Sequence, residues 1–326
     1  PPSWNFDGEG IDQTWCGLEF EWDVATDSPS ELIGLVIDGN EEYEINSDTW
    51  EERLVSLPEF KHMKRLPGCI ANITTLDGIT IRNCDMEEID PDLQYSPLTS
   101  LTITNTRLKR IPEELGNLKH LCDVWIEGNQ LVEFPEALTN CHDIYAFVLK
   151  DEPGVTSVPM SIQNWSKKLI SFSISGTGIK ELPDVFDKLY KISTLELENN
   201  PNLSTLPETI GLTDIPYSGG GFTPTGITGL VLDGCSFTSI PDVAKRARMQ
   251  YFSICNNKIT NVSKADFDAM PDLQTLRLDG NKLSTFPALT NPLLGYLSLM
   301  NCGLHKSQVD ISGLPNLSPY YFYCDE

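Results

Sequence analysis

The stretch Leu273-Gln-Thr-Leu276-Arg-Leu278-Asp-Gly-Asn281-Lys-Leu283-Ser-Thr-Phe286-Pro287 contains the pattern that decides the fold. Leu276 and Leu278 alternate with polar residues, which predicts a very short strand with two side chains on its inner face. Asn281 ends the strand, because its side-chain amide can hydrogen-bond backbone groups where the chain turns away. Phe286-Pro287 indicates an extended return segment, since proline lacks an N–H and fixes φ.

This pattern recurs eleven more times along the 326 residues. We number each repeat from its first apolar residue, so that positions 4 and 6 are apolar and position 9 is most often Asn, Cys or Thr. The other first positions are Leu32, Leu76, Leu98, Leu121, Ile144, Leu169, Ile192, Ile227, Met249, Leu294 and Leu317. Most neighbouring repeats start 21 to 25 residues apart. A single unit of this size buries too little apolar surface to fold, so the repeats must stack.

The pattern and its period resemble the leucine-rich-repeat family from about residue 32 to the end of the chain. The resemblance implies an α/β fold, a curved horseshoe-shaped solenoid with a parallel concave sheet of about 12 short strands. The return segments, such as Ile111-Pro112-Glu-Glu-Leu115 and Phe134-Pro135-Glu-Ala-Leu138, put two apolar residues on one side of a single turn. We therefore expect the convex side to carry 3-10 or short helical segments.

We expect one continuous domain with a cap at each end. Residues 1–31 form the N-terminal cap, residues 32–316 the repeats and residues 317–326 the C-terminal cap. The first segment is rich in aromatic residues, and Trp15-Cys16-Gly17-Leu18-Glu19-Phe20 looks like the Trp-x-Gly-Val-x-Cys end of the cap in plant-type extracellular members of the family. Phe20 stands where that cap has its second Cys. In the last, imperfect repeat we assign Tyr320 and Phe322 to positions 4 and 6.

Two segments interrupt the repeats. Residues 41–75 are interpreted as an enlarged or degenerate repeat, with a short helix around residues 49–56. Residues 211–226 are a glycine-rich insertion that carries Tyr217 and Phe222. Loops of this length are often functional and often merely tolerated, and we interpret this one as a mobile loop with two aromatic side chains near the ligand.

The net charge of −24 and the pI of about 4.4 restrict the partners. Nucleic-acid phosphates and an anionic membrane surface would both be repelled. Spread acidity keeps a protein soluble and monomeric, and it also suits a basic ligand. No apolar run approaches the length of a membrane-spanning helix, so we expect no membrane contact from this segment. The start at Pro1-Pro2, without an initiator Met, is consistent with a removed signal peptide or with an ectodomain expressed on its own.

Nine cysteines leave several disulfide pairings open. Cys302 and Cys324 lie one repeat apart at nearly equivalent positions, so a bridge between them could fasten the C-terminal cap. Cys122 could pair with Cys141, and Cys16 with Cys69. Cys84 and Cys235 stand at position 9, where a small buried thiol can replace the usual Asn.

Glycosylation and the cap resemblance favour an extracellular location. The chain has five Asn-x-Ser/Thr sequons, two more than the roughly three that composition gives by chance. Their asparagines are Asn72, Asn164, Asn202, Asn261 and Asn316. We expect a secreted or cell-surface protein, with an intracellular scaffold of the Leu-Pro-x-x-Ile repeat type as the alternative.

Catalytic and metal-binding motifs are missing from the sequence. The four histidines never approach Cys or carboxylates at the spacing of metal ligands, and no nucleophile elbow, phosphate-binding glycine loop or His-Glu-x-x-His occurs. We therefore expect no enzyme activity, no cofactor and no metal. An enzyme built on the repeat scaffold and an ice- or glycan-binding surface are the lesser alternatives.

The residues at positions 3, 5 and 7 should form columns on the concave face. Trp125 should stand outward beside Asp123, Glu127, Tyr145 and Lys150, as an exposed aromatic ringed by charge. Exposed Trp and Tyr are favoured interface anchors. Tyr251 and Arg277 are further candidate ligand-binding residues on this face, and Tyr296 stands in the position-3 column.

Glu196, Glu198 and Asp233 should form a carboxylate cluster near the glycine-rich insertion. For this cluster, as for Trp125, the plain alternative is that the side chains simply solvate the sheet. Asp-Gly-Asn recurs at positions 7 to 9, and we expect Gly to permit the tight turn while Asp faces water. The sequence as a whole predicts a ligand-recognition module, either a receptor ectodomain or a secreted repeat protein. Its concave face would bind a protein, peptide or glycan ligand of basic character.

Overall fold

A computed structural model describes residues 18–23, 28–40, 43–45, 52–54, 58–210, 214–216, 222–224 and 226–326. The chain divides into two compact units, Pro1–Glu152 and Pro153–Glu326, and each is described by itself. The aromatic residues Trp4, Phe6 and Trp15 of the predicted N-terminal cap lie outside the described residues, as does Cys16.

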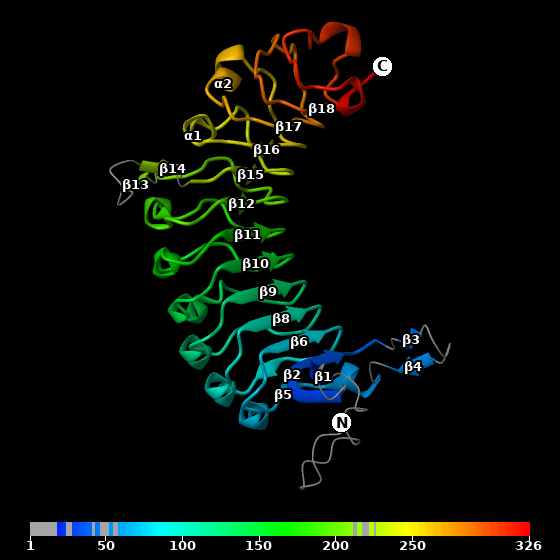
Figure 1. The fold of residues 1–326 in the computed structure, drawn as a ribbon, viewed down its shortest axis with the longest axis vertical. Helices are drawn as coiled ribbons and strands as arrows, with labels where there is room; N and C mark the ends of the chain where they lie inside the picture. The colour runs from blue at the N-terminus through cyan, green and yellow to red at the C-terminus, as the bar shows by residue number, and fades with distance from the viewer. Residues whose placement is uncertain are drawn as a thin grey trace. The chain divides into compact units, whose positions relative to one another are not determined.

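The first unit is built on a sheet of short parallel strands (Figure 1). Its strands are β1 (Leu18–Asp23), β2 (Ser28–Asp38), β6 (Gly78–Arg82), β8 (Ser100–Thr104), β9 (Asp123–Glu127) and β10 (Ala146–Lys150). β2 to β10 run parallel and in register, so that Leu101 lies beside Val124 and Val124 beside Phe147. β1 alone is antiparallel, paired with β2.

The irregular segment of the first unit differs from our prediction. Instead of a helix around residues 49–56, the structure has an antiparallel pair, β3 (Tyr43–Ile45) with β4 (Glu52–Leu54). Further on, β5 (Arg65–Leu66) pairs in parallel with β7 (Glu88–Ile89). Glu44, Ile45, Glu52 and Leu54 alternate in polarity over very short runs, which suits a strand as well as one turn of helix.

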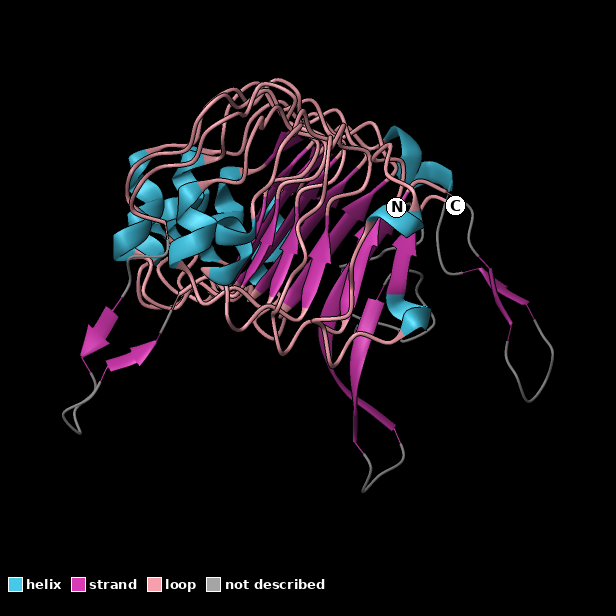
Figure 2. Ribbon diagram, turned by 90° about the horizontal axis from the view of Figure 1, so that it is seen from above, coloured by secondary structure: helices cyan, strands magenta, loops and turns pink. Residues whose placement is uncertain are grey.

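Short 3-10 helices form the side of the first unit opposite the sheet (Figure 2). They are η1 (Pro58–His62), η2 (Gly68–Asn72), η3 (Pro91–Tyr95), η4 (Glu113–Asn117) and η5 (Glu136–Asn140). Pro112 and Pro135 stand just before η4 and η5, where a missing N–H leaves no hydrogen bond unmade. Leu115 and Leu138 are fully buried, as the return segments predict.

The second unit repeats this arrangement with seven parallel strands. They are β11 (Ser171–Ser175), β12 (Thr194–Glu196), β15 (Gly229–Val231), β16 (Tyr251–Ser253), β17 (Thr275–Arg277), β18 (Tyr296–Leu299) and β19 (Phe322–Cys324). The return segments carry η6 (Met160–Trp165), η7 (Phe186–Lys188), α1 (Asp242–Arg246), α2 (Lys264–Asp268), η8 (Lys306–Gln308) and η9 (Pro319–Tyr321). With the five parallel strands of the first unit, these are the twelve strands that the repeats predict.

The insertion at residues 211–226 contains an antiparallel hairpin rather than an irregular loop. β13 (Asp214–Pro216) pairs with β14 (Phe222–Pro224) through Ile215 and Thr223. Tyr217 lies outside the described residues, and of Phe222 the structure describes only the backbone. No helix in the described part of the chain is long and apolar enough to cross a membrane.

The core of each unit consists of the apolar columns that the repeat pattern predicts. Leu276 and Leu278 are fully buried, and Leu276 lies in register with Phe252 and Leu297. Asn281 donates from its side-chain amide to the carbonyls of Leu278 and Ile254, at 2.8 and 2.9 Å. It therefore closes its own strand, as predicted, and also joins it to the preceding repeat.

In most repeats the tight turn after the strand places position 8 in the left-handed region. Gly234 and Gly280 have φ of 69° and 71°, as expected for the Gly of Asp-Gly. In other repeats Asn takes this place, for example Asn256 with φ 53°. Asn tolerates the left-handed conformation better than most residues, because its short polar side chain can hydrogen-bond locally.

The last repeat is shifted by two residues from our assignment. β19 pairs Phe322 with Leu297 and Cys324 with Leu299, so Phe322 and Cys324 occupy positions 4 and 6. Tyr320, which we assigned to position 4, is 86% exposed. Ser318 begins η9 by accepting a hydrogen bond from the Tyr320 N–H, and this extra turn delays the strand.

Candidate ligand-binding surfaces

In the first unit, Trp125 stands on the face of the sheet that is turned away from the 3-10 helices, which we call the concave face. Val124 and Ile126 of β9 are fully buried, so the alternating Asp123, Trp125 and Glu127 point outward. The indole Nε1 donates to a Glu127 carboxylate oxygen at 2.7 Å. Lys150 Nζ lies 5.3 Å from the centre of the Trp125 ring, within the range of a cation–π contact.

Tyr145 and Asp123 complete this group, and we call the five residues Asp123, Trp125, Glu127, Tyr145 and Lys150 the Trp125 cluster. The negative charge of Asp123 raises the pKa of the Tyr145 phenol. Partial burial in turn raises the pKa of Asp123 itself. Trp125 and Tyr145 are 38% and 43% exposed. The sequence therefore correctly placed an exposed aromatic pair among charges.

A second aromatic group lies on the concave face of the second unit. Tyr251 and Tyr296 flank Thr275 in register, and Arg277 lies two strands from Tyr323, with Ser298 between them. The rings of Tyr296 and Tyr323 are 5.4 Å apart. A hydrogen bond with Tyr251 is the main cause that raises the pKa of the Arg277 guanidinium. We call Tyr251, Arg277, Tyr296 and Tyr323 the tyrosine cluster.

Sequence reasoning selected only half of the tyrosine cluster. Tyr296 stands in the position-3 column but is not among the candidate residues that the sequence predicts. The assignment of Tyr320 and Phe322 to positions 4 and 6 puts Tyr323 at position 7, and the two-residue shift of the last strand moves it to position 5. The signal that could have found both is the recurrence of Tyr on the outward positions of the last repeats.

In the predicted carboxylate cluster, Asp233 is held by hydrogen bonds to the next repeat. Asp233 accepts from the Ser253 hydroxyl at 2.7 and 2.9 Å and from the Cys255 N–H at 2.7 Å. Glu196 on β12 lies in register with Val231 on β15, and Glu198 follows β12 in the chain. No group of three or more His, Cys, Asp or Glu in the described part of the chain is placed to hold a metal ion.

The Asp of Asp-Gly-Asn does not simply face water, which corrects our expectation. Asp279 accepts from the Ser298 hydroxyl at 2.5 Å and from the Met300 N–H at 2.8 Å, both in the next repeat. Asp233 makes the equivalent contacts two repeats earlier. Each of these carboxylates therefore fastens one strand to the next.

The cysteines that the structure describes are all free thiols, so the pairings that we predicted for Cys302 with Cys324 and for Cys122 with Cys141 are not formed. The Cys302 thiol donates to the Leu278 carbonyl at 3.1 Å and the Cys324 thiol to the Leu304 carbonyl at 3.3 Å.

The other pair behaves in the same way. Cys122 donates to the Thr99 carbonyl and Cys141 to the Leu115 carbonyl. Each of these four thiols donates a hydrogen bond to a backbone carbonyl and forms no bond to another sulfur. Burial raises the pKa of Cys141 to about 12 and that of Cys302 to about 11. Cys69, the predicted partner of Cys16, is free and exposed.

Cys84 and Cys235 are buried thiols at position 9, as the sequence predicts. All five sequon asparagines are exposed. They are Asn72, Asn164, Asn202, Asn261 and Asn316. Each is therefore accessible to a modifying enzyme.

Comparison with known proteins agrees with this fold. Residues 225–283 match the family model described as leucine rich repeat. A putative disease resistance protein of Arabidopsis thaliana is 25% identical over 72% of this chain. The match spans 18% of that relative's length, so this chain corresponds to only a part of it.

Solved structures with the same fold include two plant receptors. One is the leucine-rich-repeat ectodomain of the plant membrane receptor kinase GASSHO1/SCHENGEN3 from Arabidopsis thaliana, in complex with Casparian strip integrity factor 2. It has a TM-score of 0.61 and 18% identity, over 95% of this chain and 37% of that one. The other is a plant peptide hormone receptor in complex with RGF2, with a TM-score of 0.53 and 18% identity, over 87% of this chain and 51% of that one. The chain is a leucine-rich-repeat protein.

Proposed function

We propose that the chain is a recognition module that binds a protein or peptide ligand through the concave faces of its units. The observation that carries this proposal is the Trp125 cluster, in which a large aromatic side chain is exposed on the sheet and held in place on both sides. Glu127 fixes the indole N–H and Lys150 lies against the ring. An aromatic anchor that is ordered before binding loses little entropy when a ligand covers it.

The charge of the chain supports a ligand with basic residues. Asp123 and Glu127 flank Trp125, and the chain as a whole carries a net charge of −24. A field of this sign steers cationic ligands toward the protein and weakens with salt. Two receptors with the same fold are described as complexes with named ligands, one of them as a peptide hormone receptor, which supports a peptide or protein ligand here.

The test is selection of peptides from a random display library on the intact chain. We expect the selected peptides to be rich in Lys and Arg. They should lose about tenfold or more in affinity on Trp125→Ala, since truncation of an anchor residue costs about 1.4 kcal/mol or more. Tyr190→Ala removes an exposed aromatic residue outside the cluster and serves as the matched control. Selected peptides that bind Trp125→Ala as tightly as the original chain would contradict the proposal.

We further propose that the protein acts outside the cell. The exposure of all five sequon asparagines supports this location. The opposing hypothesis is an intracellular scaffold, which the free thiols of the described residues favour, because disulfides are rare in the cytosol. Mass spectrometry of protein from its native source separates the two. Glycans on the sequon asparagines are expected, and material without any glycan would favour the scaffold.

A further inference from the structure

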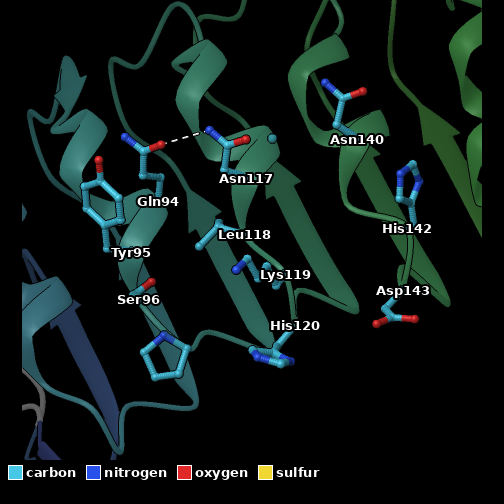
Figure 3. A pocket seen from close by; sticks show the side chains of 12 residues that line it. Gln94, Tyr95, Ser96, Asn117, Leu118, Lys119, His120, Asn140, His142 and Asp143 are labelled. Carbon is cyan, nitrogen blue, oxygen red and sulfur yellow. Dashed lines mark hydrogen bonds between the residues drawn. The ribbon is translucent and has the colours of Figure 1, made fainter.

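The first unit has a groove on its flank that the concave face does not explain. The groove encloses about 770 Å³ and lies where η3, η4 and η5 end and the chain returns to β8, β9 and β10. Figure 3 shows its side chains, which come from the same place in three successive repeats. It contains no residue of the Trp125 cluster.

A row of side-chain amides follows this groove from repeat to repeat. Gln94, Asn117 and Asn140 each stand four residues before the first position of a repeat. Asn117 Nδ2 donates to Gln94 Oε1 at 2.8 Å, which fixes the orientation of both amides. Within this pair, the Asn117 carbonyl oxygen and the Gln94 amino group remain available, as one acceptor and one donor.

An exposed aromatic ring lies beside the amides. Tyr95, next to Gln94, is 74% exposed, which is unusual for so large a side chain at the end of a 3-10 helix whose other apolar residue, Leu93, is fully buried. His120 and His142 line the groove from the two following repeats, and both are exposed. A neutral imidazole, like an amide, offers one donor and one acceptor.

The charges in the groove balance, although the chain is strongly acidic. Lys119 and Asp143 are the charged side chains of the lining, and they have opposite signs. The remaining polar groups are amides, hydroxyls and imidazoles. Such a lining provides little selectivity for a charged ligand, but it suits a ligand covered with groups that both donate and accept hydrogen bonds.

We propose that this groove is a binding site for a neutral oligosaccharide, separate from the concave face. Sugar hydroxyls can pair with the amide donors and acceptors of Gln94, Asn117 and Asn140, and a pyranose C–H face can stack on Tyr95. The row presents one amide from each of three successive repeats. These regularly spaced groups suit a ligand that is built from repeated sugar units. The lining also includes Pro97 beside Tyr95, so the groove offers apolar surface that the C–H faces of a sugar can cover.

The experiment is a calorimetric titration of the intact chain with linear neutral hexasaccharides of glucose, mannose, xylose and N-acetylglucosamine. We expect at least one to bind at millimolar concentrations or below, with an affinity that salt does not change. Tyr95→Ala and Asn117→Ala should each weaken it about tenfold. Both residues are exposed, so neither change removes core packing, and unaltered thermal unfolding of the variants checks this.

Two control variants separate this site from the rest of the molecule. Tyr190→Ala removes an exposed tyrosine after a 3-10 helix of the second unit, and Trp125→Ala removes the anchor of the concave face. Neither should change saccharide binding. The proposal is overturned if no hexasaccharide binds, or if the bound one binds Tyr95→Ala and Asn117→Ala as well as the original chain. A hexasaccharide of galacturonic acid is titrated in parallel. Binding confined to this acidic saccharide and abolished by salt would also overturn the proposal, and would point to Lys119.

Discussion

The buried carboxylate of Glu152 accepts hydrogen bonds from both the backbone N–H and the side-chain amide of Asn129, at 2.7 and 2.9 Å. Its other oxygen accepts from the Leu131 N–H at 2.9 Å. Glu152 is fully buried at position 9, where most repeats have Asn, Cys or Thr. These donors are neutral, and burial of the charge raises the pKa of Glu152 despite the hydrogen bonds.

The raised pKa predicts a pH-dependent contribution to stability. The Glu152 carboxyl binds its proton more tightly in the folded chain than in the unfolded chain. Its contribution to stability is therefore fully present below the unfolded pKa, near 4.5, and is lost as the pH rises through the folded pKa. We expect the stability of Glu152→Gln, relative to the original chain, to improve as pH is raised from about 4 to about 8. Urea midpoints across that range measure it.

The exposed Glu114 of η4 provides the matched control. Glu114→Gln should shift the urea midpoint little and by the same amount at each pH. A difference between Glu152→Gln and the original chain that stays constant with pH would show that the Glu152 carboxylate titrates alike in the folded and unfolded states.

The hydrogen bonds of Asn281 link two repeats, and removing them should lower the free energy of unfolding. Asn281→Ala removes the donor to the carbonyls of Ile254 and Leu278 and the acceptor of the Ile259 N–H, all of them buried. Each group left unpaired costs about 1 to 3 kcal/mol, so we expect a loss of about 3 kcal/mol or more in the free energy of unfolding. Urea denaturation measures it.

Asn281→Cys is a partial rescue to compare with the alanine variant. Cys302 and Cys235 already donate from position 9 to a carbonyl of the preceding repeat. The thiol should therefore retain one contact and cost less than alanine. The exposed Asn261→Ala should be close to neutral. Equal losses for Ala and Cys at position 281 would mean that the hydrogen bonds are not what stabilises this position.

Gly280 tests the turn that follows each strand. Its φ is 71°, and an added Cβ would lie 2.1 Å from the Asn256 side-chain oxygen. Gly280→Ala should cost about 1 to 2 kcal/mol for the left-handed backbone, in addition to displacing Asn256. Gly295→Ala, whose Cβ would meet its first neighbour at 3.9 Å, is the control and should be tolerated. Equal urea midpoints for the two variants would contradict the argument.

The sequence predicted the parts of the fold that repeat. Positions 4 and 6 could be assigned because each strand buries two apolar side chains in the same register, so errors in one repeat are corrected by its neighbours. The last repeat has no neighbour after it, and there Ser318-Pro319 starts a helical turn that moves Tyr323 from position 7 to position 5. The hairpins at 43–54 and 214–224 are single insertions, for which no second copy indicated the pairing.

The sequence predicts which side chains of a strand point outward, because inward and outward positions alternate. It does not predict which hydrogen-bond partner an outward or buried polar side chain will have. Trp125 and its flanking charges follow from the outward positions of one strand and its neighbour. The contact of Asp233 with Ser253 depends on a side chain reaching the next repeat. The thiol of Cys302 likewise lies close enough to pair with more than one group, and spacing alone does not distinguish a carbonyl from another sulfur.

The Trp125 cluster gives a last prediction, because Asp123 and Tyr145 report directly on its electrostatics. The negative charge of Asp123 is the main cause of the raised pKa of Tyr145. Asp123→Asn should therefore lower the pKa of this phenol toward 10, its ordinary value. Phenolate absorbance, with the same titration of a Tyr145→Phe variant subtracted, isolates the signal. Glu127→Gln removes the carboxylate bound to Trp125 and should leave Tyr145 almost unchanged. A Tyr145 pKa that does not respond to Asp123→Asn would show that the Asp123 charge does not act on Tyr145. It would then contradict the negative potential around Trp125 that the proposed basic ligand requires.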